Sequence, residues 1–87
     1  MHESSLISGL IDKVVALAHD NNASTVKAVE VSIGALAGIS PEYLMEQFRA
    51  AAAGTIVGKA ELRIDVSTDE HSPRVHELLL ITVELER

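Results

Sequence analysis

The spacing of apolar residues along this chain predicts two amphipathic helices. Between residues 4 and 21 the apolar side chains recur at i, i+3, i+4 and i+7, which is typical of a helix with one buried face. A second helix is expected to begin at Ser40-Pro41-Glu42, because serine can cap a helix and proline fits its first position. Gly54 is expected to end it.

Three further segments alternate apolar and polar residues and are predicted to be half-buried strands, at residues 26–33, 60–66 and 77–85. The resulting order, helix–strand–helix–strand–strand, is typical of an α+β fold with two helices on one face of a three-stranded sheet. Residues 67–75 form a link too short for a helical crossover, so the last two strands are expected to form a hairpin. The last strand is predicted to be central, with an inward face made of Leu79, Ile81, Val83 and Leu85 and an apolar character thickened by Leu78 and Leu80.

Composition and charge narrow the classes of function. The chain has 87 residues, of which 47% are hydrophobic and 23% charged, as expected for one globular domain over residues 1–87. Seven basic residues against thirteen acidic ones give a net charge of −6, which disfavours nucleic acid and anionic membranes as partners. No apolar run approaches the roughly 18 residues of a membrane span, and no basic stretch precedes an apolar one at the N-terminus, so a cytoplasmic protein is expected.

Residue types also limit the chemistry. The chain has no cysteine, which excludes disulfides, thiolate zinc sites and cysteine nucleophiles. The serines are accounted for as caps, strand surface and loop, and the glycines form no phosphate-binding pattern. Because no set of residues meets the requirements of a catalytic centre, we expect a protein that is not an enzyme.

The first three residues carry the clearest candidate chemistry. The α-amine of Met1, the backbone amides of His2 and Glu3, and the His2 imidazole can form a planar set of four nitrogens. Such a set suits Ni(II) or Cu(II) rather than Zn(II). Both amides must lose a proton, so neither residue may be proline, and neither is. The alternative is a solvated chain terminus whose histidine binds no metal.

A weaker candidate for metal binding lies in the polar link. His71 and His76 flank Pro73 there, five residues apart and outside any predicted helix. An exposed polar loop is the better explanation of these two histidines, since loops commonly carry such residues.

Four segments together resemble one known family: MHESSLISGLIDKV, VEVSIGALAGISPEYLMEQFRAAAAGT, GKAELRIDV and HELLLITVELER. They resemble the HypA/HybF family of nickel metallochaperones for hydrogenase maturation, over nearly the whole chain except the link. The resemblance implies a Ni(II) site formed by Met1, His2 and Glu3. No zinc is expected in this chain, because it has no cysteine. It implies two partners, a hydrogenase large-subunit precursor and a nickel-insertion GTPase. The sequence is compatible with a monomer or a weak homodimer.

The chain also departs from the family pattern. The family carries a zinc-binding lobe with two CxxC pairs between its last two strands, where this chain has only residues 67–75; a natural zinc-less paralogue and a deletion both explain this. The family tends to have acidic residues where this chain has Ala35 and Ser40. Two functions therefore stay in view: nickel delivery, and a metal-independent protein-interaction module that kept only the fold.

Overall fold

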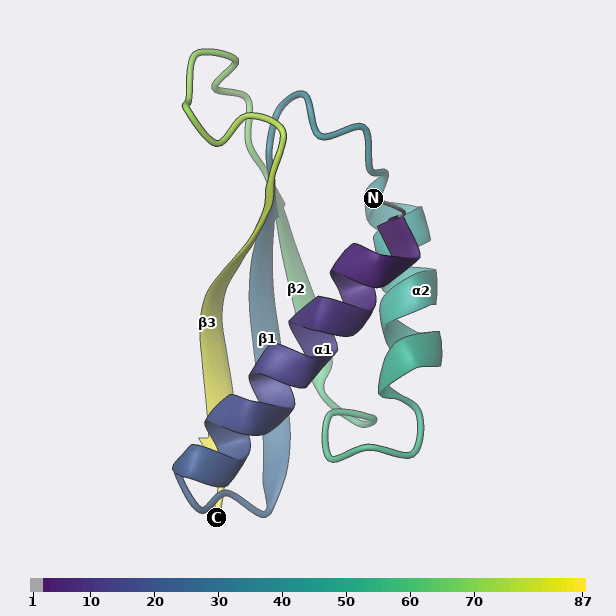
Figure 1. Ribbon diagram of the computed structural model, residues 1–87, viewed down its shortest axis with the longest axis vertical. Helices are drawn as coiled ribbons and strands as arrows, with labels where there is room; N and C mark the ends of the chain where they lie inside the picture. Colours follow the sequence, from purple (N-terminus) through teal and green to yellow (C-terminus); the bar gives the residue numbers. More distant parts are fainter. Residues whose placement is uncertain (1–2) are drawn as a thin grey trace.

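The computed structural model describes residues 3–87 and contains five elements in the expected order (Figure 1). Both helices lie on the same face of a mixed three-stranded sheet, which confirms the predicted α+β fold (Figure 1). The elements are α1 (Glu3–Asp20), β1 (Thr25–Ile33), α2 (Pro41–Ala52), β2 (Glu61–Val66) and β3 (Leu78–Glu86).

The order of strands in the sheet is β2-β1-β3, so the expected hairpin between the last two strands is wrong. β1 runs parallel to β2 and antiparallel to β3, and it occupies the centre that the sequence assigned to β3. The passage through α2 returns β2 parallel to β1, as a crossover connection does. In the structure β3 begins at Leu78, so the link is two residues longer than expected and comprises residues 67–77. It crosses the end of β1 to reach the opposite edge, a distance of two strand spacings or roughly 10 Å.

The inward face of β3 also differs from the prediction, because the strand contains a bulge. Glu30 pairs with Thr82 and Val31 with Leu80, which leaves Ile81 without a partner on β1. One extra residue moves every following side chain to the other face of a strand. Ile81 is accordingly 50% exposed. The side chains of β3 that pack against the core are Leu78, Leu80, Val83 and Leu85.

The helix ends follow from local chemistry. The Ser40 hydroxyl accepts a hydrogen bond from the Tyr43 amide at 3.1 Å, so serine caps α2 as predicted. Gly54, at φ 79°, follows the last turn of α2, and Asn22, at φ 56°, follows α1. Both residues adopt the left-handed conformation that commonly ends helices.

The hydrophobic core lies between the helices and the sheet. Its largest fully buried side chains come from every layer of the fold, so both helices and the central strand close one common interior. They are Ile7 and Val14 of α1, Val26, Val29, Val31 and Ile33 of β1, Leu44 and Phe48 of α2, and Val57 of the turn before β2.

The segment that follows β1 is hydrogen-bonded to the last residues of the link. Gly34 donates its amide N–H to the Glu77 carbonyl, and Leu36 donates to the Val75 carbonyl, both at 2.8 Å. A Cβ on Gly34 would lie 2.3 Å from the Val75 carbonyl oxygen, so only glycine fits this backbone approach. These contacts fix the link against the end of β1.

Candidate functional site

Of the three residues predicted to bind nickel, only the last belongs to the part of the chain that the structure describes. Met1 and His2 lie outside the described residues, and Glu3 is the first residue of α1. The first four N–H groups of an α-helix have no acceptor within the helix. The Glu3 amide is one of these four, so losing its proton to a metal would break no hydrogen bond of α1.

The two positions at which the chain departs from the family pattern lie between β1 and α2. Ala35 is half-buried, and Ser40 is exposed with its hydroxyl engaged in the cap of α2. Neither side chain supplies a carboxylate.

The two link histidines are exposed and have local roles. His76 donates Nδ1–H to the Leu36 carbonyl at 3.0 Å, since a carbonyl oxygen can only accept. The His71 amide donates to Asp69 Oδ1 at 3.0 Å within the link. Among residues 5–87, whose side chains the structure describes, no three His, Asp or Glu side chains come close enough together to hold a metal ion. Metal ligation by His71 and His76 stays a prediction, and the contact made by His76 ties the link to the segment after β1.

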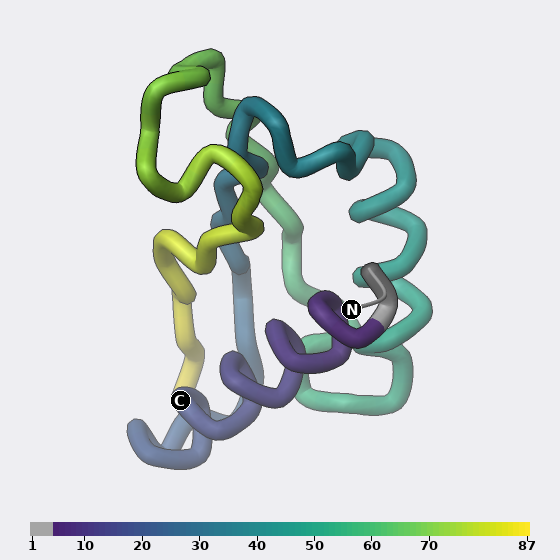
Figure 2. Tube along the Cα trace, turned by 45° about the horizontal axis from the view of Figure 1, so that its top comes forward, coloured from purple at the N-terminus to yellow at the C-terminus, as the bar shows by residue number. Residues whose placement is uncertain are grey.

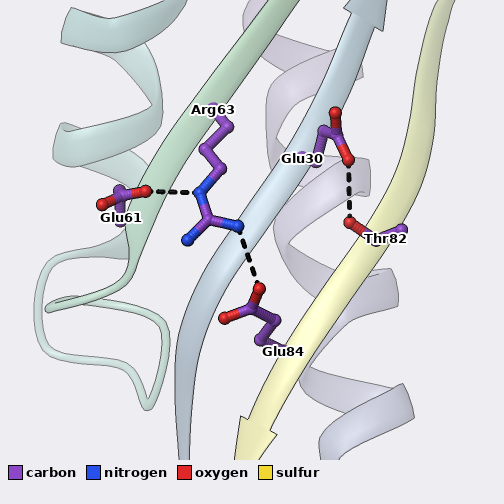
Figure 3. A network of polar contacts seen from close by, with 5 residues as sticks. All are labelled: Glu30, Glu61, Arg63, Thr82 and Glu84. Atoms are coloured by element: carbon purple, nitrogen blue, oxygen red, sulfur yellow. Dashed lines mark hydrogen bonds and ion pairs between the residues drawn. The ribbon is translucent and has the colours of Figure 1, made fainter.

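The open face of the sheet carries a network of charged side chains that the sequence pattern did not reveal. Arg63 of β2 pairs with Glu61 on its own strand and reaches Glu84 of β3 at 2.9 Å (Figure 3). Beside it, Thr82 donates its hydroxyl to Glu30 at 3.1 Å (Figure 3). The pKa of the Arg63 guanidinium is raised, mainly by its hydrogen bond to Glu61 and to a smaller extent by its hydrogen bond to Glu84. The alternation of residues 60–66 placed these side chains outward, but only the strand order brings Arg63 within reach of Glu84.

This network is a surface feature rather than a catalytic centre. All three members of the Arg63 cluster are half-exposed, so solvent screens the ion pairs. Both glutamates already bind the guanidinium, and no nucleophile lies among them. Its chemistry is limited to holding the outer strands β2 and β3 together across β1.

Among the described helices, none is long and apolar enough to span a membrane.

Comparisons with known proteins agree on one family. The family model described as "Hydrogenase/urease nickel incorporation, metallochaperone, hypA" matches residues 1–72. A hydrogenase maturation factor HypA from Chlorobium luteolum is 45% identical over 65 residues, which are 75% of this chain and 56% of that protein. The protein of the same name from Aquifex aeolicus is 39% identical over 66 residues, which are 76% of this chain and 57% of that protein. The match thus spans little more than half the length of these relatives.

Solved structures show the same fold. A solution structure of the Ni metallochaperone HypA from Helicobacter pylori superposes with a TM-score of 0.83 at 22% identity, covering 99% of this chain and 98% of that one. A second solution structure of a HypA protein gives a TM-score of 0.71 at 20% identity, covering 98% of this chain and 96% of that one. With the family model matched over most of its length, the chain belongs to the HypA family of nickel-incorporation metallochaperones.

Proposed function

We propose that this protein binds Ni(II) through residues 1–3 and delivers it as cargo during hydrogenase maturation, acting as a carrier rather than an enzyme. Two observations on related proteins support the proposal. The matching family is described by nickel incorporation, and curated relatives carry the name hydrogenase maturation factor.

The structural observation that best supports this nickel site is that α1 begins at Glu3. The Met1 amine, the His2 amide and imidazole, and the Glu3 amide supply four nitrogen donors in consecutive residues. A planar nitrogen set is the ligation typical of Ni(II). Because the Glu3 amide has no acceptor in α1, the metal can take it without unwinding the first turn.

The site predicts that nickel affinity increases with pH. The α-amine has an ordinary pKa of about 7.7–8.0, so it is mostly protonated at pH 7 and must lose that proton to bind. Each amide must lose a proton as well. Binding therefore releases protons, and lowering the pH weakens it.

A titration with Ni(II), followed by visible absorption, tests the site on protein with an unblocked Met1. We expect a yellow, diamagnetic one-to-one complex, weaker at pH 6 than at pH 8. His2→Ala and N-terminal acetylation should each abolish it, because each removes one of the four donors. His19→Ala is the matched control, since His19 is an exposed histidine near the other end of α1. Nickel binding by the acetylated protein as tight as by the unblocked one would refute the site.

Delivery is tested with a purified hydrogenase large-subunit precursor and with the nickel-insertion GTPase as partners. We expect capture of these proteins to be stronger with nickel than with a chelator, and His2→Ala to remove the difference. The metal-independent interaction module predicts equal capture under both conditions. Equal capture by the wild-type protein would therefore contradict nickel delivery.

A further inference from the structure

An apolar groove lies between the first half of α1 and the beginning of β3. It has a volume of about 360 Å³, and its walls include Leu6 and Leu10 of α1 and Leu78 and Leu80 of β3. Gly9 also lines it, and a Cβ added there would meet no atom within 4 Å. The groove is open because a glycine occupies the position in α1 where a larger side chain would fill it.

This groove lies beside an unpaired strand edge. Of the described strands only β1 pairs with β3, so one side of β3 has no strand neighbour. Gly34 donates its amide N–H to the Glu77 carbonyl, just before β3, whereas the carbonyl of the preceding residue, Ile33, accepts from the Ser67 amide on the β2 side. Successive residues here therefore direct their backbone groups alternately toward the two neighbouring segments. In an antiparallel ladder this alternation turns the backbone N–H and C=O of Leu78 and Leu80 outward. The residues whose side chains line the groove thus also present unpaired backbone groups.

The edge of β3 is protected along only part of its length. Edge strands commonly avoid unwanted pairing by carrying charges and bulges. The second half of β3 has both, with the bulge at Ile81 followed by Glu84 and Glu86. Residues 78–80 are three consecutive leucines without a charge. The unprotected part of the edge coincides with the groove.

We propose that residues 78–80 of β3 accept an added strand from a partner protein, whose alternate apolar side chains enter this groove and whose carboxylate pairs with Lys13. Successive side chains of a strand point to opposite faces, so every second residue of the added strand would face α1. Lys13 is the one charged residue in the groove wall. The ion pairs found among the described side chains involve Arg63 alone, which leaves the Lys13 ammonium available to an incoming carboxylate.

A partner segment fits this surface better than a second copy of the chain. Two copies would each bring a net charge of −6, and self-pairing would place β3 residues 78–81, which carry no carboxylate, against the groove. Lys13 would then gain no counter-charge from the paired strand. A separate peptide segment can combine apolar and acidic residues at the required spacing. The docking surface uses none of the proposed nickel donors, so its test is independent of nickel binding.

Fluorescence anisotropy on the full chain tests the proposal, in buffer containing a metal chelator. The probes are two labelled, end-capped heptapeptides of alternating isoleucine and threonine. One carries an aspartate at its N-terminal end and the other at its C-terminal end. We expect Gly9→Leu to weaken binding at least about tenfold, because its side chain fills the groove. Ala16→Leu is the matched control, since Ala16 is exposed on the same helix and does not line the groove. Leucine is a better helix former than glycine, so Gly9→Leu is expected to fold, as circular dichroism would verify.

A charge exchange tests the role of Lys13. Lys13→Glu should bind the aspartate peptides more weakly and prefer the same peptides with lysine in place of aspartate. A peptide with proline at its centre should not bind any variant, because it cannot complete the ladder. The proposal is overturned if no aspartate peptide binds the wild-type chain, or if Gly9→Leu binds as well as Ala16→Leu. It is also overturned if sedimentation equilibrium shows a dimer that Gly9→Leu dissociates, since a second copy would then occupy the groove.

Discussion

Two glycines of this chain have opposite surroundings. Gly34 lies against the backbone of the link, where an added Cβ would come within 2.3 Å of the Val75 carbonyl oxygen. Gly9 lies in the interior of α1 and faces open space. One is required by close packing, whereas the other lowers helix stability without a compensating contact.

Replacing each glycine by alanine should therefore change stability in opposite directions. Gly34→Ala is expected to lower the free energy of unfolding by about 2 kcal/mol, because backbone atoms must move apart. Gly9→Ala should raise it by about 0.5–1 kcal/mol, because alanine is the better helix former. Urea unfolding of the two variants beside the wild type measures both changes. Equal effects of the same sign would contradict the packing described for Gly34.

Single residues were predictable where the cause is local. Ser40 as a cap and Gly54 as a helix end follow from neighbours in sequence, and both were predicted correctly. The need for Gly34 depends on Val75, which lies far along the chain and approaches only after the sheet has formed. No pattern within a short window of sequence contains that information.

Among the secondary-structure elements, β1 holds the central place in the sheet. It pairs with β2 on one side and with β3 on the other, and its core-facing side chains are fully buried. The outer strands each have one described neighbour. β1 is thus the strand whose backbone is most fully enclosed.

Amide hydrogen exchange should show this arrangement directly. The amides of β1 are expected to exchange most slowly, because opening them requires losing both ladders. In β3, the outward amides of Leu78 and Leu80 should exchange faster than their neighbour Leu79, which faces β1. Uniformly slow exchange along residues 78–80 would show that the outer edge of β3 is covered.

The positions of the elements were predictable, but their pairing was not. Alternation identified all three strands, since it reports which residues alternate between core and solvent. Strand order depends on which edges meet after the α2 crossover, and the sequence alone favoured a hairpin that the structure does not contain. The bulge at Ile81 was hidden within a run of four apolar residues, where either face can be buried.

For the molecule as a whole, the proposed nickel donors are consecutive residues rather than side chains assembled by the fold. An unfolded chain therefore carries the same four nitrogens as the folded one. A ligand that binds both states equally does not change the equilibrium between them. Nickel binding and folding are expected to be independent.

Urea unfolding with and without nickel tests this independence. At a nickel concentration of 100 times the dissociation constant, a site present only in the folded state would stabilise it by about 2.7 kcal/mol. We expect a shift far below this value, and none in His2→Ala as the control. A shift near the full value would instead show that groups positioned by the fold complete the site.

The candidate sites differ in how far the sequence revealed them. Residues 1–3 were found from the chemistry of their donors, which needs no tertiary structure, and their role stays a prediction. The groove beside β3 could not be found in this way, because Lys13 and Leu80 meet only when α1 crosses the sheet. A site built from distant segments requires the fold before it can be recognised.

The anchoring of the link at both ends has a consequence for how its length can vary. The Ser67 amide bonds to the Ile33 carbonyl at its start, and residues 75 and 77 bond to the segment after β1 at its finish. Between these anchors the chain projects beyond the end of the sheet and away from both helices (Figures 1 and 2). Residues added there cost mainly the entropy of closing a longer loop, about 0.6 kcal/mol for each doubling of the loop length. Short and greatly extended links can therefore be carried by the same five-element core.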